Sequence, residues 1–448
     1  MSASPGASTA PIVAPPTKGH PGRQALAIVV AVGLTLPGLA SRLSGSHPPA
    51  WLAAVLFGLA VVGAAFVLAW GAEVLQLEVS QGLALALLAL VAVLPEYVVD
   101  FIFTWKAGED PDQYAPLALA NMTGGNRLLI GIGWSLVVLL AAWRMRRIAT
   151  DQHYVGALDT EVHLERSHAI EISFLAIASV FSLCLPLFST LTLWHSAVLI
   201  SIFVLYAIRI ARAPAEEPHL VGPAELIGSL SRPRRRVAIC VMFAFAAGVI
   251  LACAEPFAEA LVETGEEFGI STFLLVQWLA PLASESPELI VAALFAWRLN
   301  TNAALGALVS SKVNQWTLLV GSLPIVFAIS SSSLHGLPID SLQREELFLT
   351  AAQSVFAVAV LTNRSIGVKE ALALLFLFLG QFVLGAVLPE DLRALERIGI
   401  GILYLVLAAI MLVRQRHYIR PLLRDGLRTP VHEMIRSDSP PVPHPTQP

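Results

Sequence analysis

The sequence has few charged residues and few cysteines for its length of 448 residues. Only 13% of the residues are charged, whereas 56% are hydrophobic. This composition, together with apolar runs long enough to cross a bilayer, is typical of a helical membrane protein and excludes a large soluble domain. The three cysteines show no Cys-x-x-Cys spacing, so they predict neither a disulfide framework nor a metal site. They are Cys184, Cys240 and Cys253.

Sequence motifs of common enzymes are also missing. The chain contains no His-Glu-x-x-His, no Gly-x-Ser-x-Gly and no cysteine–histidine array. A membrane enzyme would need a nucleophile with its base, or a metal cluster. We therefore expect a protein that is not an enzyme and that needs no cofactor. Nothing in the sequence indicates a nucleic-acid ligand or an obligate protein partner.

Twelve apolar segments predict an all-α polytopic membrane protein with about twelve transmembrane helices. Residues 1–24 are rich in Pro, Ala, Ser and Thr, which predicts a disordered N-terminal tail. Residues 212–236 and 414–448 are expected to form a cytoplasmic linker and a cytoplasmic tail. The apolar segments are 25–42, 51–76, 80–105, 115–143, 169–189, 193–211, 237–260, 270–297, 301–328, 346–362, 368–389 and 396–413.

The distribution of basic residues predicts the orientation of these segments. If both termini are cytoplasmic, 21 Lys and Arg residues fall on the cytoplasmic side and 5 on the other side. Cytoplasmic loops of membrane proteins carry such an excess of positive charge. Arginine outnumbers lysine 24 to 4, which is compatible with a GC-rich bacterium. We therefore expect a bacterial plasma-membrane protein with both termini in the cytoplasm.

Two stretches of the chain match each other around a Pro-Glu pair. Glu96 and Glu288 each follow a proline inside a long apolar run, and each run precedes a second one rich in small residues. Arg127 and Lys312 lie near the middle of these second runs. A carboxylate in the hydrocarbon region costs about 2.5 kcal/mol or more, so an acid repeated in matching context indicates a functional site.

The matching stretches divide the chain into two units of five helices. Residues 51–211 form one unit and residues 237–389 the other, and the spans at 25–42 and 396–413 are extra helices at the two ends. Because five is odd, the second unit enters the membrane from the opposite side, which gives an inverted repeat. Inverted repeats with a site at their midplane interface are the architecture of many secondary transporters.

The two units resemble the α-repeats of the calcium:cation antiporter superfamily, the membrane region of sodium/calcium exchangers. The family signature is a Gly-Ser/Thr-Ser-x-Pro-Glu helix followed by a Gly-Asn-x-x-Gly-Ser-Asn helix, and the likeness extends to residues 267–274. The resemblance implies exchange of Ca²⁺ or another cation for Na⁺ or H⁺ by alternating access. The implied partners are the lipid bilayer and inorganic cations.

The resemblance assigns Glu96 and Glu288 as the central ligands of the transported cation. Glu285 lies three residues before Glu288 and Asp100 four residues after Glu96, so each pair shares a helix face. Further positions that match cation-binding residues of the family are Asn121, Asn126, Ser284, Ser286, Ser310 and Ser311.

The sequence departs from the family pattern in both repeats. Residues 92–94 are apolar where the family has hydroxyl groups, and in the second repeat Ala307 and Lys312 stand at asparagine positions, with Gln315 at the later one. A lysine at this place puts a cation beside the expected ion site. We therefore expect coupling or charge-pairing roles for Asp100, Arg127, Lys312 and Gln315.

Charge and helix geometry support a polar chamber and leave two alternatives open. Prolines 95 and 287 should free carbonyl oxygens near Val91 and Ala283, and such oxygens suit Na⁺ and Ca²⁺. The four acids and two bases of the chamber leave a charge of about −2 for cations or protons to neutralise. The first alternative is a Na⁺(K⁺)/H⁺ antiporter in which Lys312 and Arg127 act as internal cations. The second is a non-transporting structural membrane protein in which these bases only pair with the acids.

Overall fold

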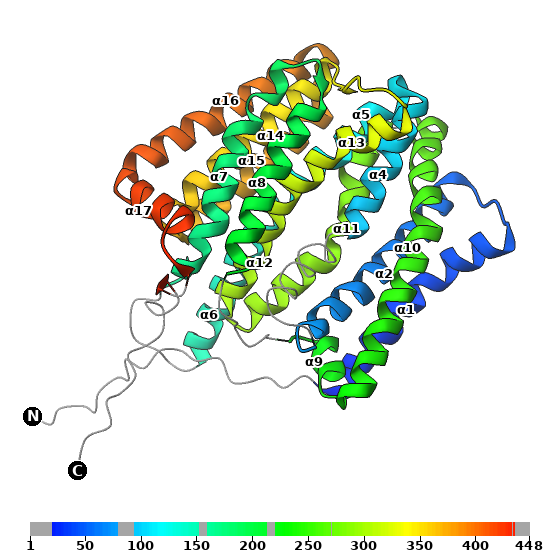
Figure 1. Cartoon of the computed structure of the whole chain (residues 1–448), viewed down its shortest axis with the longest axis horizontal. Coiled ribbons are helices and arrows are strands. Elements are labelled where there is room, and N and C mark those ends of the chain that lie inside the picture. The colour runs from blue at the N-terminus through cyan, green and yellow to red at the C-terminus, as the bar shows by residue number, and fades with distance from the viewer. Residues whose placement is uncertain are drawn as a thin grey trace, which may run out of the picture.

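The computed structural model describes residues 20–78, 94–151, 159–212, 220–269, 271–431 and 433–434. These residues form a bundle of helices (Figure 1), and eleven of the described helices are long and apolar enough to cross a membrane. The eleven match eleven of the expected spans. The other expected span, 80–105, is represented by α4 (Leu94–Glu109), because residues 80–93 lie outside the described part. Most of the tail expected at residues 1–24 also lies outside it.

The helices before the linker are those of the first repeat with one extra helix. They are α1 (Pro21–Ser44), α2 (Ala50–Leu75), α4, α5 (Pro111–Leu128), η1 (Leu129–Trp134), α6 (Ser135–Asp151), η2 (Arg166–His168), α7 (Ala169–Ser182), η3 (Leu185–Leu187) and α8 (Leu193–Ile210).

The helices from the linker onward are those of the second repeat and the C-terminal end. They are α9 (Pro223–Gly228), α10 (Arg232–Phe268), α11 (Thr272–Trp297), α12 (Thr301–Asn314), η4 (Gln315–Leu319), α13 (Val320–Ser330), α14 (Ser341–Val360), η5 (Leu361–Asn363), α15 (Val368–Val387), α16 (Glu390–Arg414) and α17 (Arg416–Leu427).

Several helices extend beyond the apolar segments that predicted them. α1 begins at Pro21, inside the expected tail, because proline is well accommodated in the first turn of a helix. α10 begins at Arg232, inside the segment expected to be a linker. α17 lies within the expected cytoplasmic tail and has only twelve residues. Hydropathy predicts only the part of a helix that lies in lipid, whereas the backbone hydrogen bonds of the helix can extend beyond the membrane.

A π-helix interrupts the corresponding span of each repeat. η1 joins α5 to α6, and η4 joins α12 to α13, so that both spans are continuous helices with one wide turn. Arg127 lies two residues before η1 and Lys312 three residues before η4. A π-helical turn shifts the helix phase and is frequently found at functional sites. The matched positions of the two turns support the two-repeat architecture.

Two short antiparallel strand pairs connect the repeats. β1 (Val162–His163) pairs with β4 (Ser365–Ile366), and β2 (Thr190–Leu191) pairs with β3 (Leu337–Pro338). β1 and β2 flank α7, and β3 and β4 flank α14, so the two pairs lie at opposite ends of these neighbouring helices. Each pair therefore joins a strand of one repeat to a strand of the other.

The buried apolar side chains form two main clusters. The larger cluster is built from α6, α7, α12, α14 and their neighbours, and the smaller one from α1, α2 and α10 with parts of α4, α5 and α11. In Figure 1 the α1, α2 and α10 group stands at one side of the bundle. α4, α5 and α11 therefore lie at the boundary between the two groups of helices.

Candidate functional site

Two glycines of α5 bring the acids of both repeats together. A Cβ atom at Gly124 would lie 1.7 Å from the carbonyl oxygen of Gln277 in α11. One at Gly125 would lie 2.6 Å from Glu285 Oε1 and 3.1 Å from Glu96 Oε1. Small residues permit this close approach of helices within a membrane. The carboxylates of α4 and α11 consequently meet beside the α5 backbone.

Pro287 of α11 leaves a helical carbonyl oxygen for another donor. Pro287 leaves the carbonyl of Ala283 without its usual helical donor, and this oxygen accepts a hydrogen bond from Ser286 Oγ at 3.2 Å. The hydroxyl of Ser286 therefore satisfies the freed carbonyl. The corresponding expectation at Val91 lies outside the described residues.

Gln315 links the acids of the two repeats. Its Nε2 donates to Glu96 Oε2 at 2.8 Å and to Glu285 Oε1 at 3.0 Å. All three side chains are buried. A single amide group at the start of η4 thus sets the relative position of the two carboxylates, one from each repeat.

Several buried oxygen atoms near Gln315, Glu96 and Glu285 accept no hydrogen bond from the residues that the structure describes. Asp100 accepts from Asn121 Nδ2 at 2.7 Å through Oδ1 only. Carboxylate and amide oxygens are the ligands that Na⁺ and Ca²⁺ prefer, and buried polar atoms are normally paired. The donor set therefore fits a hard cation. At this site, the buried oxygens for which the described residues supply no donor are Glu96 Oε1, Asp100 Oδ2, Asn121 Oδ1, Glu285 Oε2 and Gln315 Oε1.

Glu288 lies in the same helix as Glu285 but has a different partner. Its Oε2 accepts from Ser311 Oγ at 2.7 Å, and it is only half-buried. Ser284 donates to the carbonyls of its own helix, and Ser310 shares a hydrogen bond with Tyr206 of α8. Of the predicted serines, Ser311 is thus the one hydrogen-bonded to an acid.

A preformed metal cluster is not present in the part of the chain that the structure describes. Within it, no three His, Cys, Asp or Glu side chains converge as metal ligands. Glu96 and Glu288, the two expected central ligands, therefore do not form such a cluster with a third acid. Amide oxygens have to complement the carboxylates if a cation binds here.

Arg127 points away from these acids. Its Nη1 lies 2.5 Å from Glu346 Oε2 in α14, and its Nη2 donates to Gln381 of α15. Both side chains of the pair are buried, at 2% and 4% exposure. The guanidinium also lies over the ring of Trp278, 5.2 Å from the centroid. Arg127 therefore belongs to a second polar cluster.

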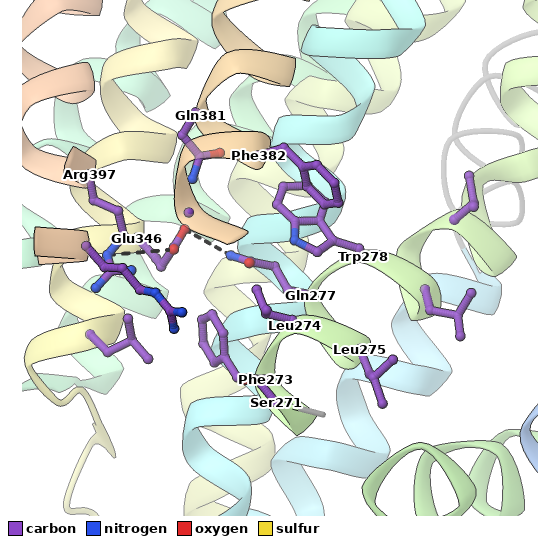
Figure 2. Close-up of a pocket in the computed structure, with 15 residues that line it drawn as sticks. Ser271, Phe273, Leu274, Leu275, Gln277, Trp278, Glu346, Gln381, Phe382 and Arg397 are labelled. Carbon is purple, nitrogen blue, oxygen red and sulfur yellow. Dashed lines mark hydrogen bonds and ion pairs between the residues drawn. The ribbon is translucent and has the colours of Figure 1, made fainter. Parts of the chain in front are cut away.

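The second polar cluster lies at a cavity of about 660 Å³. Figure 2 shows Gln277 and Arg397 approaching Glu346 from opposite sides. Gln277 Nε2 donates to Glu346 Oε2 at 2.9 Å, and Arg397 pairs with Glu345 at 2.7 Å. The sequence reasoning missed this cluster. The feature of the sequence that could have indicated this cluster is the occurrence of two polar residues, Gln277 and Gln381, inside apolar spans.

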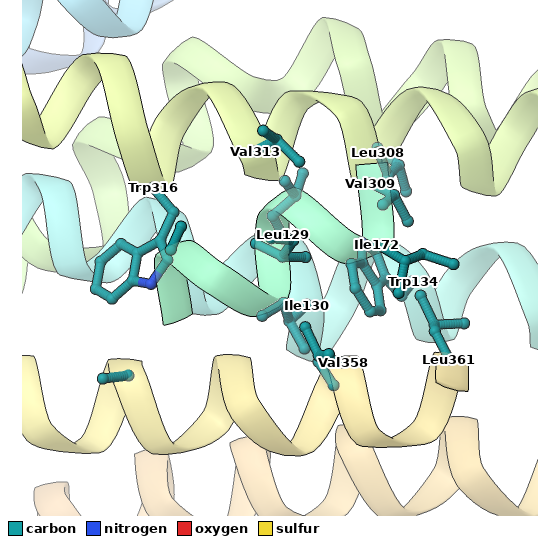
Figure 3. Close-up of a cluster of buried hydrophobic side chains, with 14 of the residues drawn as sticks. Leu129, Ile130, Trp134, Ile172, Leu308, Val309, Val313, Trp316, Val358 and Leu361 are labelled. Atoms are coloured by element: carbon teal, nitrogen blue, oxygen red, sulfur yellow. The ribbon is translucent and has the colours of Figure 1, made fainter. Parts of the chain in front are cut away.

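Lys312 is buried, and Glu285 and Glu96 are the described acids that attract its ammonium, although neither forms an ion pair with it at contact distance. Its Nζ donates to Asn126 O at 3.0 Å and to Asn126 Oδ1 at 2.6 Å, and no described carboxylate lies within ion-pair distance. The ammonium also lies 4.7 Å from the centre of the Trp316 ring. Figure 3 shows Trp316 and Trp134, one from each π-helix, at the two ends of a buried apolar cluster. Lys312 therefore lies between the apolar core and the polar site.

The fold and the site define a class of protein. Two repeats, matched through their π-helices and strand pairs, bring buried acids from both halves to one place in a membrane-spanning bundle. This is the architecture of a secondary transporter.

The chain belongs to the family described as sodium/calcium exchanger protein, whose model matches residues 49–211 and 238–386. It is accordingly an integral membrane cation antiporter of the calcium:cation antiporter superfamily and not an enzyme.

Solved structures agree with this assignment. The chain is 40% identical to the H⁺/Ca²⁺ exchanger CAX, with a TM-score of 0.82, over 93% of this chain and 100% of that one. The Ca²⁺/H⁺ antiporter protein YfkE has the same fold at 13% identity and a TM-score of 0.57, over 85% of this chain and 99% of that one. The comparison with curated proteins found no match.

Proposed function

We propose that the protein exchanges Ca²⁺ for protons across the membrane by alternating access. The observation that carries this proposal is the pair formed by Glu96 and Glu285, whose carboxylates are bridged by Gln315 and retain buried oxygens without donors. The 40% identity to a protein described as an H⁺/Ca²⁺ exchanger supports the same ions.

The proposed exchange follows from the charge of the site. Buried carboxylates are stable only when a cation or a proton neutralises them. Ca²⁺ would be held by carboxylate and amide oxygens, and its departure would leave the same oxygens to take up protons. One set of acids can thus bind either ion but not both, which couples the two fluxes.

The buried Lys312 favours a second candidate, Na⁺(K⁺)/H⁺ exchange. A fixed cation beside the acids lowers the negative charge that remains for the transported ion. This would suit monovalent ions better than Ca²⁺. The hydrogen bonds of Lys312 to Asn126 place its ammonium at a residue of the proposed site.

Flux measurements in proteoliposomes test both candidates. Ca²⁺, Na⁺, K⁺ and H⁺ gradients are imposed one at a time on the purified protein. We expect Ca²⁺ uptake driven by a proton gradient and little uptake driven by Na⁺. Proton-coupled Na⁺ or K⁺ flux without Ca²⁺ flux would support the second candidate, and no cation-dependent flux would refute both.

Substitution of the central acids tests the site. Glu96→Gln and Glu288→Gln keep side-chain shape but remove charge and proton capacity, so each should abolish exchange in a protein that still folds. Glu266→Gln, which changes an exposed acid at the end of α10, is the matched control and should exchange normally. Normal flux from a well-folded Glu288→Gln protein would remove Glu288 from the site.

We further propose that both termini lie in the cytoplasm of a bacterial cell. The two ends of α10 should then face opposite sides of the membrane. Cysteines introduced at Ser231 and Ser271, both exposed, should react with an impermeant reagent from opposite sides in a cysteine-free protein. Labelling of both from the same side would contradict the proposed topology.

A further inference from the structure

The C-terminal helix α17 is fixed to the bundle by one of its faces. Asp425 accepts from Arg166 Nε at 2.7 Å and from Arg166 Nη2 at 3.0 Å, next to the start of α7. Ser173 of α7 donates to Leu422 O at 3.2 Å. A Cβ atom at Gly426 would lie 2.1 Å from Ser173 Oγ, so the two helices are in close contact. This face of α17 is therefore unavailable to any partner.

A basic residue of α8 completes this attachment. Arg209 donates to the carbonyl oxygens of Asp425 and Gly426 at 3.2 and 3.1 Å, and also to that of Thr429. The last carbonyl groups of a helix have no partner within it, and an arginine at this end also favours the helix dipole. The position of α17 is thus set by both α7 and α8.

The opposite face of α17 carries a stripe of arginines. Residues four apart in a helix are neighbours on its surface. The stripe is exposed, and Asp425, the acid of α17, is buried against Arg166. Among the residues that the structure describes, Arg424 is the member of the stripe that approaches an acid, with Nε 3.5 Å from Asp425 Oδ1. The arginine stripe consists of Arg416, Arg420 and Arg424 of α17, together with Arg428, which directly follows the helix.

The arginine stripe follows the last turn of α16, where we expect the headgroups of a bilayer. α16 exposes apolar side chains along its length, and Ile402, Val406 and Val413 are 51%, 49% and 67% exposed, so lipid contacts α16 up to its last turn. α17 begins two residues after the end of α16. Tyr418 and Leu427 are exposed among the arginines at 55% and 41%. Basic residues mixed with aromatic and aliphatic ones are typical of a helix in the membrane interface.

We propose that the arginine stripe of α17 binds the phosphate headgroups of anionic phospholipids. Charge complementarity identifies the partner, because four neighbouring guanidinium groups attract a surface that carries many negative charges. Arginine also binds phosphate oxygens through two parallel hydrogen bonds. Headgroup binding on one face and the Arg166 pair on the other then hold α7 at a fixed depth.

Hydrogen exchange of the full-length protein in lipid nanodiscs tests this proposal. The backbone amides of α17 should exchange at least threefold more slowly in nanodiscs of equal parts phosphatidylglycerol and phosphatidylcholine than in phosphatidylcholine alone. The difference should shrink at high salt, since screening weakens attraction between exposed charges. Inorganic phosphate added to phosphatidylcholine nanodiscs should give no such protection.

Substitutions separate the arginine stripe from general effects of charge. The triple variant Arg416→Gln, Arg420→Gln and Arg428→Gln spares Arg424 and should lose the lipid-dependent protection. The corresponding triple change to Lys should retain most of it, which also shows that α17 still folds.

The control triple variant Arg146→Gln, Arg232→Gln and Arg234→Gln removes the same charge from exposed positions of α6 and α10 and should behave as the wild type. Equal protection by phosphatidylglycerol in the glutamine variant of the arginine stripe, or protection by inorganic phosphate, would overturn the proposal.

Discussion

Replacing Gly125 by alanine should disturb the ion site while leaving the fold intact. The added Cβ would lie 2.6 Å from Glu285 Oε1 and 3.1 Å from Glu96 Oε1. Both contacts are with the ends of side chains, which can retreat. At Gly124, by contrast, the obstacle is the backbone oxygen of Gln277 at 1.7 Å. Gly124→Ala should therefore prevent correct packing, whereas Gly125→Ala should act on the carboxylates.

The size of the effect follows from these contacts. Glu285 Oε1 has to move by about 0.8 Å to reach the 3.4 Å of ordinary van der Waals contact. Ca²⁺ accepts oxygen ligands only within about 2.3–2.6 Å, so this movement takes a carboxylate out of coordination. We expect the apparent affinity for the transported cation to fall at least tenfold, which corresponds to about 1.4 kcal/mol. Overpacking should lower the free energy of unfolding by about 1–3 kcal/mol.

Concentration-dependent flux and thermal unfolding measure the two effects. Gly33→Ala is the matched control, because Gly33 is an exposed residue of α1 with no other atom within 4 Å of an added Cβ. It should keep normal flux and gain up to about 1 kcal/mol of helix stability. A folded Gly125→Ala protein with unchanged cation affinity would refute the placement of the two carboxylates beside α5.

Three further predictions concern the buried and interfacial charges. Glu346→Gln leaves Arg127 buried without its acidic partner and should lower the free energy of unfolding by about 3–5 kcal/mol, which is measured as a lower unfolding temperature. An unchanged unfolding temperature would show that the pair contributes nothing to stability. Lys312→Asn should shift cation affinity or proton dependence in a stable protein, and unchanged flux at every pH would exclude Lys312 from coupling. The Arg166 guanidinium lowers the pKa of Asp425, so α17 docking should be fully present above the unfolded pKa of about 3.9 and lost as pH falls through the lower folded value. A spin label on α17 should report this release, and mobility independent of pH would contradict it.

The parts of the candidate site that the sequence predicts depend on local pattern. Glu96 and Glu288 directly follow prolines in apolar runs and Glu285 lies two residues before Pro287, and an acid in such a run is conspicuous. The fold class could be predicted because hydropathy, like these motifs, is a local property of the sequence. Asn121 and Gln315 were found through the family resemblance, although their partners were not.

The parts that it missed depend on contacts between distant helices. Arg127 and Glu346 are 219 residues apart, and nothing in either segment predicts their pairing. The direction of Arg127 also depends on how α5 meets η1 and on the helices beside it. Because the π-helical turn η1 shifts the helix phase, a regular helical period does not predict where the Arg127 side chain points. Both ends of α10 and the whole of α17 were missed because they lie outside the apolar segments.

The strand pairs β1 with β4 and β2 with β3 restrict how the bundle can change shape. The strand pairs join the segments at both ends of α7 and α14, which are the fourth helices of the two repeats. We call these two linked helices the frame, and they are held together at each end. The two repeats are therefore joined at both ends of this frame. α1, α2 and α10 pack mainly in the other apolar cluster and carry none of these strands, so we expect them to be freer than α7 and α14 to move relative to the acids.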